Sequence, residues 1–492
     1  MDKPDRIVGR DRQWGAVERF LFDGGFDGPL RLGLVSGRRR TGKTQLLAEA
    51  CREVGGLYTV CVQDEGDLAA RRRFAADISG HLLTTPMSAD PPDWETLLRS
   101  ALEVAERTTP RGRPPLVVID EFPYAVAHAP ELPSILQHLY DRVQRGSGLT
   151  GRLILCGSAL SVMHELLSGA KPLRGRVMLD LRMPPLDYRE AAHLWGIADP
   201  QVAFRVHATV GGIPGYRPLI LGTPRSVTEF DDWVTTNLLA VDFGVFTHSE
   251  VDHLLREDPR ITSRAIYFDI LSAIAAGAHT PTAIGGAIGR DANAVRYQLG
   301  VLESAGYISR ASDLLRARKP TITVADPLIR FDRLITAPHL GQLEFGRAAR
   351  VWAAAAPTFR SNILGAHFEQ LARDWAGRFA PDELNRPDGF GDIGFATVQD
   401  NAGRAKHEID VLGVSGRSIT LIGAAKATLG RRGIADLARL DHIAGILRTS
   451  DYDTADSTIV LFASSGFTSE LEQAAAHRRD VELVDLDRLY GG

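Results

Sequence analysis

Residues 32–47 read Leu32-Gly-Leu-Val-Ser-Gly37-Arg-Arg-Arg-Thr-Gly42-Lys43-Thr44-Gln-Leu-Leu47. The stretch predicts a buried strand, a loop bounded by glycines and the start of a helix, and the loop fits the pattern G-x-x-x-x-G-K-[ST]. Glycines at 37 and 42 allow the backbone to curl so that its N–H groups point inward at phosphate oxygens. The sequence therefore predicts a phosphate-binding loop in which Lys43 reaches the outer phosphates and the Thr44 hydroxyl holds Mg²⁺.

The composition is that of a chain with several ordinary globular domains. Its 492 residues are too many for a single hydrophobic core, and 44% hydrophobic with 24% charged residues is typical of a globular protein. A formal net charge of −4 gives no general signal for a nucleic-acid partner, although a local basic face is compatible with it. No apolar run approaches the length of a membrane span and the N-terminus has no apolar targeting segment, so we expect a cytoplasmic protein with no membrane partner.

The three cysteines, Cys51, Cys61 and Cys156, are widely spaced. This spacing argues for a reducing compartment and against disulfides or a zinc site. Lysines are scarce beside arginines in this chain. A lysine inside a motif is therefore more readily explained by its compact ammonium group than by routine surface charge.

A second motif supplies acidic side chains. Residues 115–121 read Pro115-Leu-Val-Val-Ile119-Asp120-Glu121, in which an apolar run ends in two carboxylates. This predicts a buried parallel strand whose carboxyl tip lies at the ligand edge of a sheet. Asp120 would hold the Mg²⁺ through water, and Glu121 would polarise the attacking water. A solvated strand end is the alternative for this segment alone, and the phosphate loop upstream argues against it.

Two further segments carry weaker signals. Ser158 comes shortly after the apolar residues 153–156, where a small polar residue at a strand tip could sense the γ-phosphate or could simply cap a helix. The loop 171–176 contains Arg174 and Arg176 around a glycine. These arginines could supply positive charge to the transition state in their own or a neighbouring subunit, or they could be surface arginines.

Two turns flank this region. Val8-Gly9-Arg10 precedes an amphipathic helix, and Val210-Gly-Gly-Ile-Pro214-Gly-Tyr216 separates two helical stretches. Each is an ordinary turn when taken alone. Placed before and after a phosphate loop, they resemble the segments that line the nucleotide base, and pack against it, in AAA+ and STAND ATPases.

The order of these segments covers about half of the chain and resembles the archaeal-type ATPases of the AAA+/STAND group. The resemblance implies a three-layer αβα core with a helical lid, ATP or ADP as ligand, and hydrolysis that is slow or regulated in many relatives. The nucleotide-binding residues that it implies are Gly9, Arg10, Gly37, Arg40, Thr41, Gly42, Lys43, Thr44, Gln45, Ser158 and Pro214. The implied metal contacts are Thr44 and Asp120, and the implied catalytic residues are Lys43, Glu121 and Arg176.

Residues 264–324 predict three helices followed by a β-hairpin, which is the layout of a winged helix. The first helix runs from Arg264 to Ala276, Thr280 caps the second, and the third runs from Ala292 to Ala305. Its inward residues would be Val295, Leu299 and Leu302. Its exposed face would offer Asn293, Arg296, Tyr297 and Gln298. That face could contact double-stranded DNA, and a packing or lid role is equally open.

The C-terminal region places Glu369 in a helix, Asp410 in a strand over 407–414 and Lys426 at the end of the next strand. This resembles the layout of PD-(D/E)xK nucleases, in which two carboxylates bind Mg²⁺ and the lysine helps to generate the nucleophile. The same ATPase family carries such a domain. The second carboxylate should stand two residues before the lysine, where this chain has Ala424. We therefore expect the nuclease-like domain to be inactive.

These patterns predict an ATPase core over residues 1–185, a helical lid over 186–255, a winged helix over 256–338 and a degenerate, restriction-endonuclease-like α/β domain over 339–492. The predicted function is an ATP-binding and ATP-hydrolysing molecular switch that acts on or near DNA. An ATP-gated, metal-dependent DNA nuclease and a winged-helix DNA-binding regulator are the alternatives. Assembly into a homo-oligomer is compatible with all three.

Overall fold

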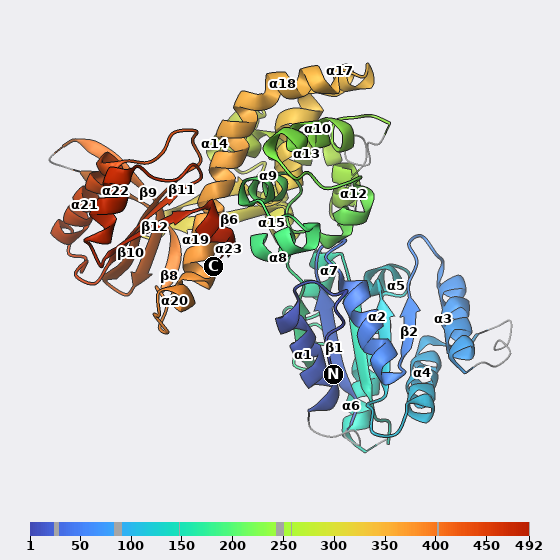
Figure 1. The fold of residues 1–492 in the computed structure, drawn as a ribbon. Coiled ribbons are helices and arrows are strands. Elements are labelled where there is room, and N and C mark those ends of the chain that lie inside the picture. The colour runs from blue at the N-terminus through green and yellow to red at the C-terminus, as the bar shows by residue number, and fades with distance from the viewer. Residues whose placement is uncertain are drawn as a thin grey trace. The chain divides into compact units, whose positions relative to one another are not determined.

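The computed structural model describes residues 1–23, 29–82, 91–146, 148–242, 250–256, 258–400 and 403–491. The chain divides into two compact units (Figure 1). The first contains residues 1–186 and two short returns of the chain, 213–216 and 254–262, and the second contains the other described residues. The main segment of the first unit thus ends beside the core boundary predicted at residue 185. Apart from these two returns, the lid, winged helix and C-terminal domain predicted downstream lie in the second unit, and the divisions between them stay predictions.

A five-stranded parallel sheet forms the centre of the first unit, with strand order β2-β3-β4-β1-β5. Its strands are β1 (Arg31–Ser36), β2 (Leu57–Val60), β3 (Leu116–Asp120), β4 (Arg152–Gly157) and β5 (Val177–Arg182). β3 and β4 are buried at every residue, as their apolar runs predict. Because all of the strands are parallel, their carboxyl ends meet at one edge of the sheet. The loop after β1 and the acidic tip of β3 therefore lie at the same edge.

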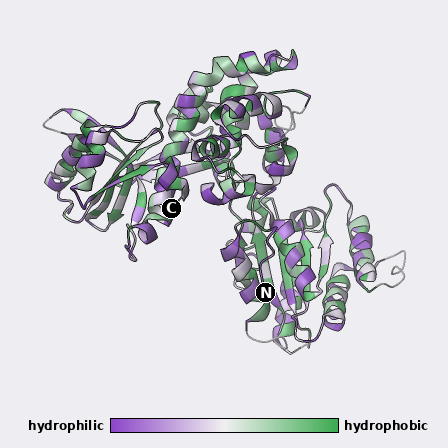
Figure 2. Cartoon of the chain, viewed as in Figure 1, coloured by the Kyte–Doolittle hydropathy of each residue, from purple (hydrophilic) through white to green (hydrophobic). Residues whose placement is uncertain are grey.

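Helices cover both faces of this sheet, because alternate residues of each strand point to opposite sides. Val118 belongs to the apolar cluster that α1 and α2 form, whereas Val117 belongs to the cluster that α3, α4 and α6 form. Figure 2 colours much of the sheet green, for hydrophobic residues, between helices that carry purple, hydrophilic residues. The helices are α1 (Asp11–Phe22), α2 (Lys43–Val54), α3 (Asp67–His81), α4 (Trp94–Thr108), α5 (Phe122–His128), α6 (Leu132–Gln144) and α7 (Leu160–Glu165). The predicted three-layer αβα core is confirmed.

The region predicted as a lid is helical. It contains α8 (Tyr188–Trp195), α9 (Pro200–Val210), the 3₁₀ helix η1 (Pro214–Leu219), α10 (Val227–Asn237) and α12 (Glu250–Arg256). None of the helices among the described residues has both the length and the apolar composition that crossing a membrane requires.

Three helices and a hairpin follow in the predicted order. They are α13 (Arg264–Ala275), α14 (Pro281–Ala287), α15 (Arg296–Ser304), β6 (Ile308–Asp313) and β7 (Arg316–Val324), and the two strands pair antiparallel. Thr280 caps α14, and the inward residues predicted for α15 are all buried. The third helix begins later than the predicted Ala292. The Asp291 carboxylate accepts the backbone N–H groups of Asn293 and Ala294, at 2.7 and 3.0 Å, and this turn takes the place of the first helical turn.

The chain continues through helical turns across the boundary predicted at residue 338. Pro338 occupies an early position of a short helix, where its missing N–H costs nothing. Phe359 lies 5.7 Å from Phe230 of α10 and 5.0 Å from Trp352, measured between ring centroids, so this region packs against α10. The helical elements are α16 (Pro327–Phe331), η2 (Asp332–Thr336), η3 (Ala337–His339), α17 (Leu340–Glu344), α18 (Ala348–Thr358), η4 (Phe359–Leu364), α19 (Gly365–Arg378) and α20 (Ala380–Glu383).

A second five-stranded sheet, with order β12-β11-β10-β9-β8, ends the chain. Its strands are β8 (Asp392–Asp400), β9 (Ala405–Ser415), β10 (Ser418–Lys426), β11 (Thr458–Ala463) and β12 (Val481–Asp485), with α21 (Ile434–Thr449), α22 (Ser469–Ala476) and α23 (Leu486–Gly491) between or after them. β8, β9 and β10 pair antiparallel, whereas β10, β11 and β12 pair parallel. An apolar cluster packs α21 against one face, and Trp375 of α19 meets Phe462 from the sheet with ring centroids 5.5 Å apart.

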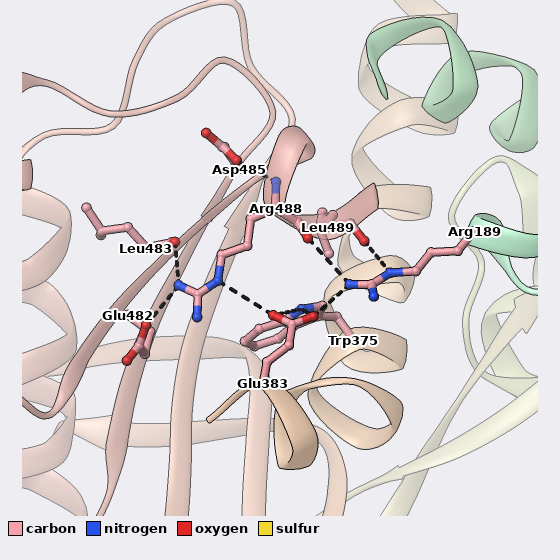
Figure 3. A network of polar contacts seen from close by, with 8 residues as sticks. All are labelled: Arg189, Trp375, Glu383, Glu482, Leu483, Asp485, Arg488 and Leu489. Carbon is pink, nitrogen blue, oxygen red and sulfur yellow. Dashed lines mark hydrogen bonds and ion pairs between the residues drawn. The ribbon is translucent and has the colours of Figure 1, made fainter. Parts of the chain in front are cut away.

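A polar network joins α8 to the end of the chain (Figure 3). The Arg189 guanidinium donates to the Glu383 carboxylate and to the carbonyl oxygen of Leu489, both at 2.7 Å. Glu383 also accepts from the Trp375 indole at 3.2 Å and pairs with Arg488 at 3.6 Å. Elements that are far apart in the sequence are thus held together inside the second unit.

Candidate functional site

The phosphate loop runs from the end of β1 to the first turn of α2. Gly42 caps α2 with φ of 92°, in the left-handed region that favours glycine. Gly37 is required for space instead, because a Cβ at this position would lie 2.6 Å from the carbonyl oxygen of Met183. The backbone therefore needs both of the predicted glycines, one for its conformation and the other for close packing.

Lys43 is buried inside the curl of the loop, with only 4% of its surface exposed. Its Nζ donates to the carbonyl oxygens of Gly37 and Arg38, at 2.8 and 2.9 Å. The Thr41 hydroxyl donates to the same Arg38 oxygen at 2.8 Å and closes the loop further. An ammonium group has three donors, so two loop carbonyls leave one donor for a ligand in the curl.

Asp120 and Thr44 meet at the carboxyl edge of the sheet. The Thr44 hydroxyl donates to Asp120 Oδ2 at 2.7 Å, and the Glu121 backbone N–H donates to Oδ1 at 2.9 Å. A hydroxyl that donates to a carboxylate turns its lone pairs away from it, toward the open side of the loop. Thr44 is exposed on that side, whereas Asp120 is buried. This donor set fits Mg²⁺ held by the hydroxyl oxygen directly and by the carboxylate through water.

Tyr58 is a site residue that the sequence does not single out. Its hydroxyl donates to Asp120 Oδ2 at 2.6 Å, beside the bond from Thr44. Burial and the Asp120 carboxylate raise the pKa of this hydroxyl, so it stays a neutral donor around pH 7. Parallel pairing of β2 with β3 places Tyr58 there, and a tyrosine in an apolar strand carries no local signal of that contact.

Glu121 and Ser158 are in contact. The Glu121 carboxylate accepts the Ser158 hydroxyl at 3.0 Å and the Ser158 backbone N–H at 3.4 Å. Glu121 itself has φ of 52°, a left-handed conformation that costs a non-glycine residue on the order of 1 kcal/mol. Ala159, not Ser158, is the N-cap of α7, so the helix-cap interpretation of Ser158 is wrong. The predicted general base and the predicted phosphate sensor directly follow the adjacent strands β3 and β4, and two hydrogen bonds join them.

The turn at Gly9 and Arg10 reaches the phosphate loop. Arg10 has φ of 66° and a buried side chain whose guanidinium donates to the carbonyl oxygen of Thr41 at 2.9 Å. Gln45, in the first turn of α2, donates at 3.3 Å to the carbonyl oxygen of Arg6. The chain before α1 is therefore bonded both to the loop and to the helix that follows it.

The turn that contains Pro214 lies against the other side of the loop. The Gly215 backbone N–H donates to the Arg40 carbonyl oxygen at 3.0 Å, and the Arg40 guanidinium lies 6.0 Å from the centre of the Tyr216 ring. A Cβ at position 215 would approach the Arg40 Cβ to 2.5 Å. The glycine after Pro214 thus allows this turn to close on the loop, and residues 213–216 belong to the first unit for that reason.

Arg176 lies away from this edge. It precedes β5, whose Val177 pairs with Leu32 near the start of β1, whereas the phosphate loop follows the end of β1. A rise of about 3.3 Å per residue separates Leu32 from Ser36, at the end of β1, by roughly 13 Å. The guanidinium is paired with Asp141 of α6 through two bonds of 2.8 Å. A catalytic contact of Arg176 within its own chain is therefore wrong, and a contact with a second copy stays a prediction.

The residues of the nuclease-like pattern come together in the second unit. The Lys426 ammonium lies 3.6 Å from Asp410 Oδ2, which also accepts the Ala425 backbone N–H at 2.9 Å. Glu369 and Asp410 line the same cavity of about 640 Å³. Burial and the neighbouring Asp410 raise the pKa of Glu369 to about 7. Glu408 also lines this cavity, with 73% of its side chain exposed, and its carboxylate lies 3.6 Å from the Lys406 ammonium.

The raised pKa of Glu369 predicts a stability change with pH. Its ordinary value is 4.5 and its folded value is about 7, so between these limits the folded chain binds more protons than the unfolded chain. The free energy of unfolding therefore falls as the pH rises through this window, by about 3 kcal/mol in total. We expect Glu369→Gln to remove this decline in urea denaturation at pH 5 and pH 8. Equal slopes in the two proteins would contradict the assignment, and Glu470→Gln, an exposed glutamate in α22, is the control.

The face predicted to meet DNA is exposed. Asn293 and Arg296 are exposed at the start of α15, and Tyr297 has 62% of its surface exposed. Gln298, the fourth residue predicted for this face, is only half-exposed, so the exposed part of the face consists of the other three side chains.

The first unit thus has a P-loop α/β fold with a lysine, a threonine and two carboxylates at one sheet edge. No protein-family model matches the chain. The uncharacterized protein MJECL04 of Methanocaldococcus jannaschii is 26% identical over 348 residues, which are 69% of this chain and 71% of the relative.

Two solved structures are similar. The Walker-type ATPase PABY2304 of Pyrococcus abyssi aligns with 67% of this chain and 97% of its own, with a TM-score of 0.50 and 18% identity. The ORC2 protein of Aeropyrum pernix, in its ADPNP-ADP complexes, covers 72% of this chain and 97% of its own, with a TM-score of 0.47 and 14% identity. The first similarity shows that this chain shares its fold with a Walker-type ATPase.

Proposed function

We propose that this protein binds and hydrolyses ATP with Mg²⁺ and works as a molecular switch of the AAA+/STAND type. The hydrogen bond from the Thr44 hydroxyl to Asp120, next to the buried Lys43, carries the proposal. A bound Mg²⁺ supplies charge neutralisation on the outer phosphates. Glu121 is the adjacent carboxylate that can accept a proton from an attacking water, and Ser158 orients it.

The chain supplies a route from the phosphate loop to the second unit. The turn over 213–216 is bonded to Arg40 and follows α9 directly in the sequence. Gln201 of α9 donates to the carbonyl oxygen of Ser464 at 2.5 Å, and Arg189 of α8 holds the C-terminal network of Figure 3. A change in the loop on hydrolysis would therefore be passed to elements that are fixed to the C-terminal sheet.

The direct test of the enzymatic claim is phosphate release from ATP by the full chain. We expect phosphate release that requires Mg²⁺ and that stops when Asp120 is replaced by Asn. This change removes the negative charge of the carboxylate that is proposed to hold Mg²⁺. Lys171→Ala, on the surface of the same unit, is the control. Release that is unchanged in Asp120→Asn would contradict the proposed site.

We propose that the switch acts on or near DNA through a winged helix formed by α13, α14, α15 and the β6–β7 hairpin. The exposed Arg296 and Tyr297 support this. Arg296→Ala should weaken duplex binding and lower the magnitude of the salt slope by about 1 in a fluorescence anisotropy titration. Arg417→Ala, an exposed arginine on the turn between β9 and β10, is the control. An equal loss in both variants would point to non-specific charge and against this surface.

A nuclease is the second candidate, favoured by the cluster of Glu369, Asp410 and Lys426. We expect no cleavage of plasmid or oligonucleotide DNA with Mg²⁺ or Mn²⁺, because alanine at 424 supplies no ligand and Glu369, with a pKa of about 7, is only partly ionised near pH 7. Cleavage by the wild type that disappears in both Asp410→Ala and Lys426→Ala would overturn this expectation. Ala424→Glu tests the reason, since any restored cutting would show that the missing carboxylate is what silences the cluster.

A further inference from the structure

Three potential metal ligands converge away from the sites described so far. They are Asp400 at the end of β8, His407 near the start of β9 and His442 in α21, and their ligand atoms all lie within 4.8 Å of one another. We infer that these three side chains form a binding site for a divalent transition-metal ion of the zinc class.

The strand register brings the first two together. β8 and β9 pair antiparallel, with His407 opposite Val398 and Asp400 opposite Ala405. Asp400 and His407 are therefore diagonal neighbours on one face of the hairpin. α21 packs on that face through an apolar cluster that contains Val398 and Ile443, and this places His442 above the pair.

The spacing suits tetrahedral coordination. Zinc ligands at about 2.0–2.1 Å from the ion lie about 3.3 Å from one another. His442 Nε2 is 3.2 Å from Asp400 Oδ2, and His407 Nε2 is 4.0 Å from the same oxygen. Small side-chain rotations are enough to bring all three atoms into a first coordination shell.

Two details indicate that the carboxylate and one imidazole are oriented for a ligand. The Gly403 backbone N–H donates to Asp400 Oδ1 at 2.9 Å, and the other oxygen, Oδ2, is the one that His442 contacts. His407 Nε2 is buried and has no hydrogen-bond partner, although it points at this oxygen. A simple hydrogen bond between His442 and Asp400 would leave that nitrogen unsatisfied, whereas a metal ion would satisfy it.

Three protein ligands leave the fourth position of a tetrahedral ion to water, and His442 has 55% of its side chain exposed on the solvent side. Such an ion would join the β8–β9 hairpin to α21. Carboxylate and imidazole ligands favour zinc or cobalt over Mg²⁺, which the oxygen-rich sites at Asp120 and Asp410 would prefer. The site is thus distinct in chemistry from both.

The test is a Co²⁺ titration of the full chain after removal of metals, followed by visible absorption in excess Mg²⁺, and then competition with Zn²⁺. We expect one equivalent of Co²⁺ that Zn²⁺ displaces. His407→Ala and His442→Ala should each weaken binding about tenfold or more, since even outer-shell changes cost that much. His442 is half-exposed on a helix, so this variant is expected to fold, and circular dichroism checks that it does.

His477→Ala, an exposed histidine at the end of α22, and Asp410→Asn are the matched controls and should bind as the wild type does. Binding of equal strength in the wild type and both site variants would overturn the inference. So would a loss of binding in Asp410→Asn alone, because that result would assign the ion to the nuclease-like cluster.

Discussion

Replacing Lys43 with Ala should lower the affinity for ATP and for ADP at least about 100-fold. The ammonium is buried in the loop and has one donor left for phosphate beyond its bonds to Gly37 and Arg38. On ligand binding it can exchange these carbonyls for phosphate oxygens. Hydrogen bonds to charged groups contribute about 1.5–3 kcal/mol each, and two of them correspond to two orders of magnitude or more in affinity. Isothermal titration with each nucleotide in the presence of Mg²⁺ measures the change.

The control for this variant is Lys171→Ala, which removes an exposed lysine of the same unit that pairs with Glu165. It should bind nucleotide as the wild type does. Unchanged ATP affinity in Lys43→Ala, with the fold intact by circular dichroism, would show that the glycine-bounded loop is not the nucleotide site.

Replacing Glu121 with Gln should preserve ATP binding while phosphate release falls by about 10²–10⁴-fold, the usual contribution of a positioned general base. Glutamine keeps an oxygen that can accept from Ser158, so the side chain can hold its place, but it cannot take a proton from water. A phosphate-release assay at saturating ATP and an equilibrium binding measurement separate the two effects.

Ser158→Ala separates the orientation of the Glu121 carboxylate from its ability to take up a proton. It removes the hydroxyl that holds the Glu121 carboxylate and leaves the charge, so we expect a smaller fall in turnover than in Glu121→Gln. Phosphate release by Glu121→Gln at the wild-type rate would remove Glu121 from the role of base. The second strand-end carboxylate, Asp120, would then be the group to examine.

The parts of the site that follow from local sequence could be predicted. The strand, loop and helix of residues 32–47 are contiguous. Asp120 ends a strand whose other residues are apolar, and Glu121 follows it directly. Parallel strands bring such segments to one edge whatever the rest of the fold does, so Thr44 and Asp120 could be expected to meet.

The parts that depend on strand order and register could not be predicted. Tyr58 reaches Asp120 only because β2 is the neighbour of β3. Arg176 lies far from the phosphate loop because β5 pairs parallel with β1, which places the residue before β5 beside the amino end of β1. The ligands of the inferred metal site come from two strands and a helix. β8 itself, which supplies Asp400, is a mixed strand of exposed and buried residues without a strong apolar pattern.

Local sequence also does not predict that the lid, winged helix and C-terminal domain share one compact unit. Phe230 and Phe359 carry no signal that they stack, and Arg189 carries none that it pairs with Glu383, 194 residues further along the chain. Hydrophobic periodicity predicts each helix and strand by itself. It does not show which of them pack together, because tertiary contacts pair residues that are distant in sequence.

The central claim is that the second unit responds to the nucleotide bound at the phosphate loop. Sedimentation velocity tests it most directly, with Glu121→Gln loaded with ATP and the wild type loaded with ADP, each with and without duplex DNA. The account predicts that the ATP and ADP forms differ in mass or in the amount of DNA they retain. Indistinguishable sedimentation of the two forms, both with and without DNA, would contradict it.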